Sequence, residues 1–238
     1  MKNFPRLGLV LLASLGTAVV SACSDGAPTV REALSESSQA VVVGDIVITE
    51  LFYNPADTDT GKEWFEVTNV TGAAIDINGW TLTNKNNTHT IANGAPLLVP
   101  AGGHLVLGQS TNTATNGGVA VAYAYGTAWG DLVNGNSGDT VRLTAPGITL
   151  PIDEVVYQGN GTGTWPNPGS TGVALNLNPA LTSAVANNLP GSWCLATVTF
   201  GTDNGKGTPG KANTSCGGGT GGASGSGGAA GAAGAAGT

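Results

Sequence analysis

The chain has 238 residues, of which 10% are charged, and 15 acidic against 8 basic residues give a formal net charge of −7. This balance argues against nucleic-acid binding, because the clustered Lys and Arg side chains that neutralise phosphates are missing. The low charge content, with Asn, Thr, Ser and Gly supplying most of the polarity, favours one extracytoplasmic β-rich domain.

The first 22 residues have the pattern of a signal peptide. Lys2 and Arg6 are followed by an uncharged apolar stretch at 7–20, which is too short for a comfortable membrane span. Small residues then precede Cys23 in an arrangement that resembles a bacterial lipobox, which implies a lipid on Cys23 as the first mature residue. The alternative is an ordinary signal peptide with an incidental Cys23. In bacteria whose sorting rule retains lipoproteins that carry Asp after the cysteine, Ser24 favours the outer membrane, so we expect an outer-membrane-anchored lipoprotein of the cell envelope, or a secreted protein.

The remaining chain divides by composition. Residues 23–41 have no apolar periodicity and are expected to form a disordered tether. Residues 42–216 suffice for one domain with a sizeable core. Residues 217–238 consist of Gly, Ala, Ser and Thr, so a disordered Gly/Ala-rich tail is expected there. Removal of the two basic signal-peptide residues leaves 6 basic against 15 acidic residues, a mature charge of −9.

The domain begins with two strand-like runs, 46–53 and 63–69, joined by a turn-rich acidic loop. In the first run Ile46, Ile48, Glu50 and Phe52 alternate with Val47, Thr49, Leu51 and Tyr53. In the second, Phe65 and Val67 share one face, which leaves Glu66 on the other. This alternation predicts that Glu66 points outward and that these apolar residues lie in the core: Ile46, Ile48, Phe65, Val67, Trp80 and Leu82.

Short strands separated by turns are predicted along the rest of the domain. Asn-Gly pairs, which favour turns with positive φ, recur through it, and no segment has a convincing helical period apart from a weak turn at 179–185. The composition therefore predicts an all-β sandwich or barrel. Residues 159–188 are the least strand-like part; we expect a loop with Trp165 folded back on the sandwich, although such a loop could also carry a binding site. Further strands are expected at 80–84, 88–91, 105–107, 120–125, 140–144, 154–157 and 198–200.

Several of these segments together resemble the lamin tail domain family in its bacterial secreted version. The matching pieces are ITELFYNP at 48–55, EWFEVTN at 63–69, DINGWTLT at 76–83, PAGGHLVLG at 100–108, GDTVRL at 138–143 and the closing GTPGKAN at 207–213. The resemblance implies an immunoglobulin-like β-sandwich of lamin-tail type. It also implies a structural or binding role, since the family has no shared catalytic residues.

Three cysteines are present. If Cys23 carries lipid, Cys194 and Cys216 remain as a pair in an oxidising compartment, where a disulfide is the default. Closing the 21-residue loop between them would add roughly 3 kcal/mol of stability in the chain-entropy model. A metal site is the weaker alternative, because the CxxC spacing is missing.

The acidic loop is the best candidate for a bound ion. Asp57, Asp59 and Glu63 lie within seven residues, and hard oxygen ligands at that density suit Ca²⁺. The competing interpretation, which we favour, is that the aspartates cap a solvated turn. The expectation is thus no metal and no other cofactor, with Ca²⁺ as the exception to test.

The sequence offers little for catalysis. His89 and His104 stand in strand-and-turn surroundings, and Glu63 and Glu66 point to opposite faces of a strand because they are three residues apart. We therefore expect no catalytic residues. The favoured function is a non-enzymatic envelope module in adhesion or envelope organisation, with the membrane as partner through Cys23 and an unknown protein or polysaccharide as ligand. The alternatives are an accessory domain for extracellular polysaccharide or DNA, marked by clustered exposed aromatics, and a hydrolase, marked by a deep pocket holding a histidine.

Overall fold

The structure, a computed structural model, describes residues 40–159, 163–169 and 172–217. The expected signal peptide, the predicted lipid site Cys23 and nearly all of the tether and tail lie outside this part, so the boundaries at 42 and 216 stay predictions. Within it, the regular elements are strands and three 3₁₀ helices: η1 (Pro179–Leu181), η2 (Ala186–Asn188) and η3 (Pro190–Ser192). η1 lies within the weak turn predicted at 179–185, whereas η2 and η3 lie beyond it.

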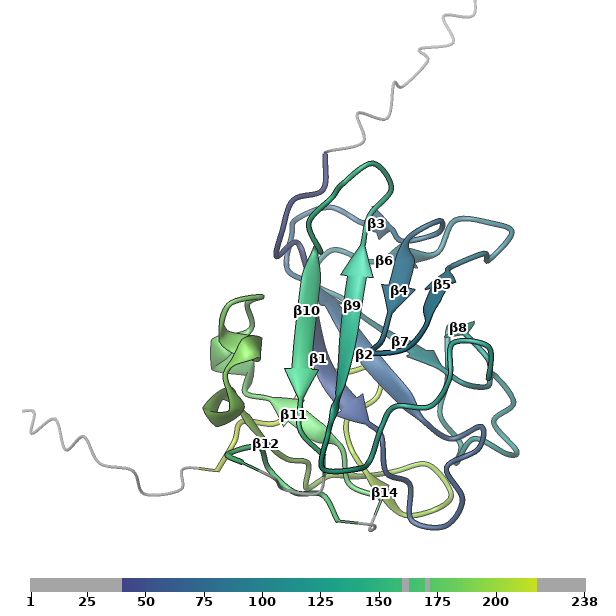
Figure 1. Cartoon of the computed structure of the whole chain (residues 1–238), viewed down its shortest axis with the longest axis vertical. Coiled ribbons are helices and arrows are strands. Elements are labelled where there is room, and N and C mark those ends of the chain that lie inside the picture. The colour runs from purple at the N-terminus through teal and green to yellow at the C-terminus, as the bar shows by residue number, and fades with distance from the viewer. Residues whose placement is uncertain (1–39, 160–162, 170–171, 218–238) are drawn as a thin grey trace, which may run out of the picture. The chain divides into compact units, whose positions relative to one another are not determined.

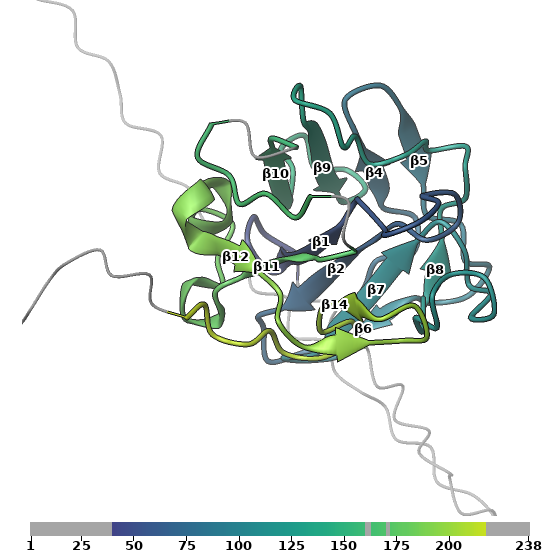
Figure 2. The ribbon, with the colours of Figure 1, turned by 90° about the horizontal axis from the view of Figure 1, so that it is seen from below.

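Two main sheets pack face to face, as Figures 1 and 2 show. The larger has the order β12 (Trp193–Leu195), β11 (Leu175–Leu177), β1 (Ile46–Phe52), β2 (Trp64–Asn69), β7 (His104–Gly108) and β8 (Tyr123–Ala124). The smaller has the order β10 (Asp153–Tyr157), β9 (Asp139–Thr144), β4 (Thr81–Thr83) and β5 (Thr88–Thr90). Paired neighbours run antiparallel except β7 and β8. The predicted all-β sandwich is confirmed.

Two small strand pairs complete the described part: β3 (Ile75–Asp76) with β6 (Leu98–Val99), and β13 (Thr199–Phe200) with β14 (Gly205–Lys206). The β13–β14 hairpin does not join either main sheet. In Figure 2 it lies across the six-stranded sheet, on the face turned away from the four-stranded sheet. The six-stranded sheet therefore has covers on both faces.

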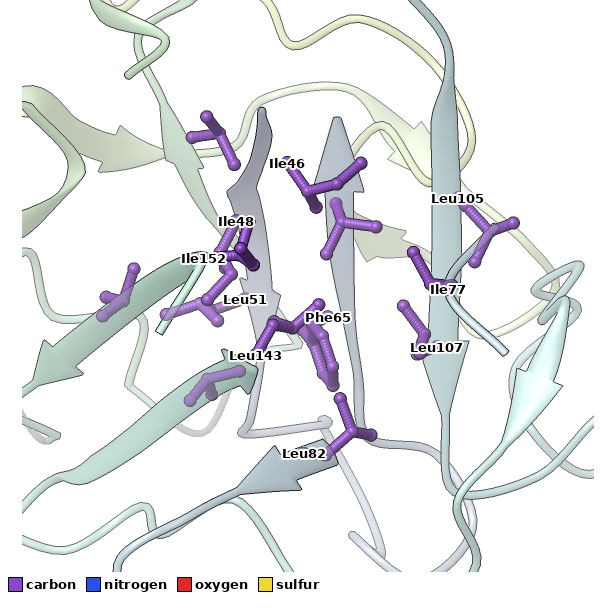
Figure 3. Packing of buried hydrophobic residues seen from close by; sticks show 14 of the residues in the cluster. Ile46, Ile48, Leu51, Phe65, Ile77, Leu82, Leu105, Leu107, Leu143 and Ile152 are labelled. Atoms are coloured by element: carbon purple, nitrogen blue, oxygen red, sulfur yellow. The ribbon is translucent and has the colours of Figure 1, made fainter. Parts of the chain in front are cut away.

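The main core fills the space between the two sheets. In Figure 3, Leu51, Phe65 and Leu143 approach one another from β1, β2 and β9. The Phe65 ring lies 6.0 Å from that of Tyr125 and 5.7 Å from that of Trp129, measured between centroids. All six residues predicted for the core are buried, which confirms the assignment.

A β-bulge at Thr49 reverses the alternation of β1. Ile48 pairs with Val67 and Glu50 with Glu66, so Thr49 is an extra residue on β1. Beyond it, Leu51 joins Ile48 in the main core, whereas Phe52 belongs to a second cluster on the other face. The strict alternation expected from the sequence, with Glu50 and Phe52 on the face of Ile48, was wrong because a bulge shifts the side-chain period by one residue.

The outward orientation predicted for Glu66 requires a correction. Glu66 does lie on the face opposite the main core, but that face is covered and Glu66 is fully buried. Its Oε1 accepts a hydrogen bond from the Thr49 hydroxyl and lies 3.1 Å from Nδ1 of His104. The prediction failed because it took the sheet to be solvated on one side, as antiparallel sheets often are.

The cover is the segment 207–213, which carries the GTPGKAN motif. The Thr208 amide donates to Glu50 Oε1 over 2.8 Å, and the Gly210 amide donates to Glu66 Oε2 over 2.7 Å. Burial raises the pKa of Glu50 well above its usual value of 4.5, and the neighbouring Glu66 raises it further. Two facing carboxyl groups are thus held inside the protein by backbone amides of the closing segment.

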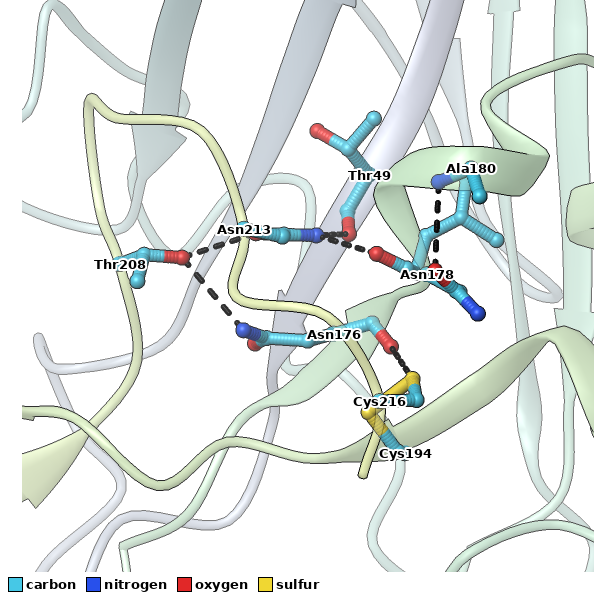
Figure 4. The surroundings of a disulfide bond; sticks show 9 residues. Thr49, Asn176, Asn178, Ala180, Cys194, Thr208, Asn213 and Cys216 are labelled. Carbon is cyan, nitrogen blue, oxygen red and sulfur yellow. Dashed lines mark hydrogen bonds between the residues drawn. A yellow bond between two sulfur atoms is a disulfide. The ribbon is translucent and has the colours of Figure 1, made fainter. Parts of the chain in front are cut away.

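The end of this closing segment is fixed beside β11 and β12 (Figure 4). The side-chain Nδ2 of Asn213 donates to the backbone carbonyls of Thr49 and Leu177 over 2.7 and 2.9 Å. Three residues later Cys216 forms a disulfide with Cys194 of β12, with their Cα atoms 5.6 Å apart. The bond therefore attaches the segment at the point where the Gly-rich tail begins.

The predicted strands and the observed ones agree in place more than in extent. Each of the nine predicted strands overlaps an observed one, whereas β3, β6, β11, β12 and β14 were missed. β11 lies inside the stretch 159–188 that was expected to be a loop, and it pairs with β1. Trp165 does fold back as expected, since it is buried with its ring 5.9 Å from Trp193.

Two substitutions test the two faces of β2. Phe65→Ala is expected to lower the free energy of unfolding by about 3–5 kcal/mol, because it leaves a cavity between the sheets. Glu66→Gln is expected to cost about 1–3 kcal/mol, because Gln has one acceptor oxygen where Glu66 uses two, so either the Gly210 N–H or the Thr49 hydroxyl loses its buried acceptor. Asp57→Asn, at an exposed position, should cost less than about 0.5 kcal/mol. Urea unfolding measures all three; a Glu66→Gln midpoint equal to that of Asp57→Asn would contradict the buried position.

Candidate functional site

A shallow hollow, open to solvent, lies where the loop after β1 meets the β13–β14 hairpin. The acidic loop contributes Pro55, Ala56, Asp57 and Lys62, and the loop before β8 contributes Asn116 and Gly117. The hairpin and its surroundings add Gly172, Phe200, Asp203 and Gly205, and β1 adds Phe52. The site is therefore assembled from segments that are far apart in sequence.

Three aromatic rings form the apolar cluster beneath this hollow. Phe52 and Trp64 stack with centroids 5.3 Å apart, and Phe200 meets both edge-on, at 5.4 Å from Phe52 and 5.6 Å from Trp64. Phe52 reaches this face because of the bulge at Thr49, and Trp64 lies directly opposite it on β2. Phe52 and Trp64 are buried and Phe200 is half-buried, so the hairpin ring closes the cluster.

An ion pair crosses the rim of the hollow. Lys62 Nζ lies 2.5 Å from Asp203 Oδ2, which ties the acidic loop to the hairpin. The hydrogen bond from Lys62 lowers the pKa of Asp203. Asp57, also on the rim, is exposed. The rim therefore carries one more negative than positive charge, and such a rim suits a positively charged group better than an anion.

The loop before β8 approaches the hairpin through glycine. A Cβ on Gly201 would lie 1.9 Å from the Gly117 carbonyl oxygen, and Gly201 has a φ of +63°. The Thr202 amide donates to the same Gly117 carbonyl over 2.9 Å. A side chain at residue 201 would force these two walls of the hollow apart.

Glu63 fixes the acidic loop at its far end. Its Oε2 accepts hydrogen bonds from the Leu132 amide over 2.7 Å and from Gln109 Nε2 over 3.0 Å. The same Gln109 nitrogen donates to Asp131 Oδ1, and the Gln109 oxygen accepts from the Gly61 amide. Glu63 therefore joins the loop to the segment after residue 130 through one buried carboxyl group.

Burial raises the pKa of Glu63 from 4.5 to about 9. The Leu132 hydrogen bond acts in the opposite direction, while the negative charges of Asp131, Asp59 and Asp139 raise the pKa further. At neutral pH the group is thus a neutral acid in the folded chain and a carboxylate in the unfolded one.

The three candidate calcium ligands lie in different surroundings in the structure. Asp57 faces solvent at the hollow, Asp59 accepts a hydrogen bond from Asn134 Nδ2 over 2.8 Å, and Glu63 turns inward. In the described residues no group of three or more His, Cys, Asp or Glu side chains is placed to hold a metal ion. The loop does not bring its carboxylates together as a calcium site requires.

Neither histidine lines the hollow. His89 Nε2 lies 2.7 Å from the Tyr123 hydroxyl, and burial lowers the pKa of His89. His104 Nδ1 lies 2.9 Å from the Thr68 hydroxyl, beside Glu66. Glu63 and Glu66 make their contacts on opposite sides of β2, so they do not act as a pair. The sequence did not identify Phe200, Lys62 or Asp203 as site residues. The only local signal was that these aromatic and charged residues flank turns.

The titration of Glu63 predicts a pH dependence of stability. Its pKa in the fold is above the unfolded value, so its contribution to stability is fully present below about pH 4.5 and is lost as pH rises toward about 9. Asp153, whose pKa burial raises to about 6, changes stability in the same direction at lower pH.

We expect the free energy of unfolding, measured with urea, to fall between pH 6 and 9 by up to about 1.4 kcal/mol per pH unit for one proton. Glu63→Gln, which imitates the neutral acid, should flatten this decline and leave the chain more stable than wild type at pH 9. Asp57→Asn serves as the control that keeps the wild-type slope. Parallel pH profiles for wild type and Glu63→Gln would show that Glu63 titrates normally.

Comparisons with known proteins place most of the described sandwich in one family. The family model of the Lamin Tail Domain matches residues 39–159, slightly more than half of the chain. The match ends before β11 and the closing GTPGKAN segment, where the similarity rests on the quoted motif. Searches of curated proteins and of solved structures found no match. With its two packed sheets of immunoglobulin-like type and this match, the chain belongs to the lamin tail domain family.

Proposed function

We propose that this protein is a non-enzymatic binding module attached to the bacterial cell envelope by a lipid on Cys23. The family supports a binding or structural role for an immunoglobulin-like domain. The pattern of residues 1–23 supports export and lipid attachment. In the described residues no helix is long and apolar enough to cross a membrane, and the proposed anchor needs none.

The observation that carries the proposal is the hollow with its aromatic floor and acidic rim. The half-buried Phe200, which packs over the buried Phe52, offers apolar surface, and Asp57 and Asp203 stand beside it with one cation, Lys62, between the two loops. An apolar stem that ends in a positive charge satisfies both parts, as the side chain of a Lys or Arg on a partner protein would. The ligand is therefore proposed to be a basic segment of another envelope protein, in adhesion or envelope organisation.

The other candidate functions find less support. The large exposed hydrophobic side chains of the described residues are Val and Leu, whereas a polysaccharide platform would present exposed aromatic rings. Extracellular DNA would meet an acidic surface. A hydrolase finds less support, because the lining residues include no histidine and one of the two lining aspartates, Asp203, is paired with Lys62.

The lipid anchor has a direct test. Mass spectrometry of the mature N-terminus is expected to find a diacylglycerol-modified Cys23 as the first residue, because the small residues before it are those that the lipoprotein pathway accepts. A mature chain that begins at another residue, or an unmodified Cys23, would contradict this prediction.

The hollow can be blocked without disturbing the core. Ala56 is exposed at its rim, so Ala56→Arg should fill it and lower the affinity for the ligand by at least about tenfold. An array of envelope proteins, basic peptides and glycans, read with and without Ca²⁺, identifies the ligand. Ala101→Arg, the same change at an exposed position of the β6–β7 turn, is the matched control and should bind as wild type does.

Three results would contradict the proposal. The ligand could bind equally well to Ala56→Arg and to wild type, or it could prove to be a glycan rather than a basic protein segment. Binding that requires Ca²⁺, and that Asp59→Asn abolishes, would assign the acidic loop to a metal site instead.

A further inference from the structure

One end of the sandwich exposes aliphatic side chains from three separate segments. Val42 and Val43, just before β1, are 59% and 55% exposed, Leu150 in the β9–β10 turn is 65% exposed, and Val185 between η1 and η2 is 79% exposed. Isolated exposed aliphatic residues are ordinary, but a group of them at one place indicates an interaction surface.

Contacts around Gly44 bring the three segments together. The Gly44 amide donates to the Ile152 carbonyl over 2.8 Å. Val43 is the neighbour of Gly44 and Leu150 is two residues from Ile152, so this hydrogen bond brings their segments together. An ideal Cβ on Gly44 would lie 3.7 Å from the Ala184 Cβ, next to Val185. In Figure 1 the segment before β1 and the β9–β10 turn lie at the same end of the molecule.

The 3₁₀ segment is held firmly in this position. Asn187 of η2 is fully buried, and its side-chain nitrogen donates to the Asp153 carboxylate over 2.6 Å and to the Ile48 carbonyl over 3.3 Å. The Trp193 indole nitrogen donates to the Asn187 carbonyl over 2.8 Å. Val185 is therefore exposed on a fixed turn that packs against β1 and β10.

The same three segments contain no charged residue. Residues 40–44, 145–151 and 178–190 include no Asp, Glu, Lys or Arg, although the mature chain carries 15 acidic and 6 basic residues. We call these three segments the uncharged end. Asp45, the nearest acidic residue in sequence, turns its carboxylate back to the Val42 amide over 2.8 Å.

We propose that the uncharged end rests on the surface of a phospholipid bilayer. The inference rests on the proposed lipid at Cys23, because the chain from Cys23 enters the described structure at Ala40, within this end. Seventeen residue-to-residue steps separate the two positions, which limits their distance to about 60 Å even for a fully extended chain. An acidic protein held that close to lipid head groups approaches them most favourably with its uncharged, apolar side.

The test uses the mature chain with Cys23→Ser, so that binding to vesicles does not depend on lipid attachment. Co-sedimentation with phosphatidylcholine vesicles compares it with a triple variant, Val43→Asp, Leu150→Asp and Val185→Asp. The matched control puts the same three charges elsewhere, at the exposed positions Val156, Leu195 and Val198. Circular dichroism and thermal melting confirm that each variant is folded.

The triple Asp variant is expected to lose about tenfold in vesicle binding, because three carboxylates replace the apolar surface whose burial drives binding to the interface. The control should bind as the parent does. A second set, Val43→Ser, Leu150→Ser and Val185→Ser, removes apolar surface without adding charge and should also weaken binding.

Failure of the parent chain to sediment with vesicles would overturn the inference, and so would equal losses in both Asp variants. These outcomes are distinct from failure of the proposed function, which is read from the mass of the native N-terminus and from Ala56→Arg. Ala56→Arg should bind vesicles as the parent does.

Discussion

The structure depends on the burial of both faces of the β1–β2 pair. One face meets the four-stranded sheet through Leu51 and Phe65, which directly oppose each other. The other face carries Glu50 and Glu66, also directly opposite each other and fully buried. Two buried carboxyl groups side by side are unfavourable unless hydrogen-bond donors satisfy them and at least one stays protonated. The amides of Thr208 and Gly210 supply donors, so the fold is complete only when the closing segment is in place.

This constraint explains why widely separated motifs belong together. The Glu of ITEL, the second Glu of EWFEV and the amides of GTPGKAN meet at one buried cluster, although 158 positions separate Glu50 from Thr208. The segment is then fixed by Asn213 and by the Cys194–Cys216 disulfide. The bulge at Thr49 belongs to the same arrangement, because it turns Glu50 and Phe52 toward the covered face. The buried acid and the aromatic floor of the hollow therefore have a common origin.

The two ends of the domain differ in character. At one end the acidic loop, the hairpin and the Gly117–Gly201 contact enclose a hollow with charged groups on its rim. At the other, three uncharged segments meet around Gly44. A sandwich of this type lets its strands fix the positions of loops at both ends, so the surface at each end can differ without changing the core.

The sequence by itself determined the strand-forming segments, the faces of Phe65 and Val67, the family and the all-β class, because period-two alternation and turn residues are local signals. It could not place β11, whose hydrogen bonds go to a strand more than 120 residues earlier, nor the hollow, whose walls meet only after folding. The bulge left no mark in the alternation, and Glu66 looked solvated because nothing in residues 63–69 reveals that residues 207–213 cover them. Tertiary structure decided these points, since whether a sheet face is wet or buried depends on what packs against it, and that partner was distant in the chain.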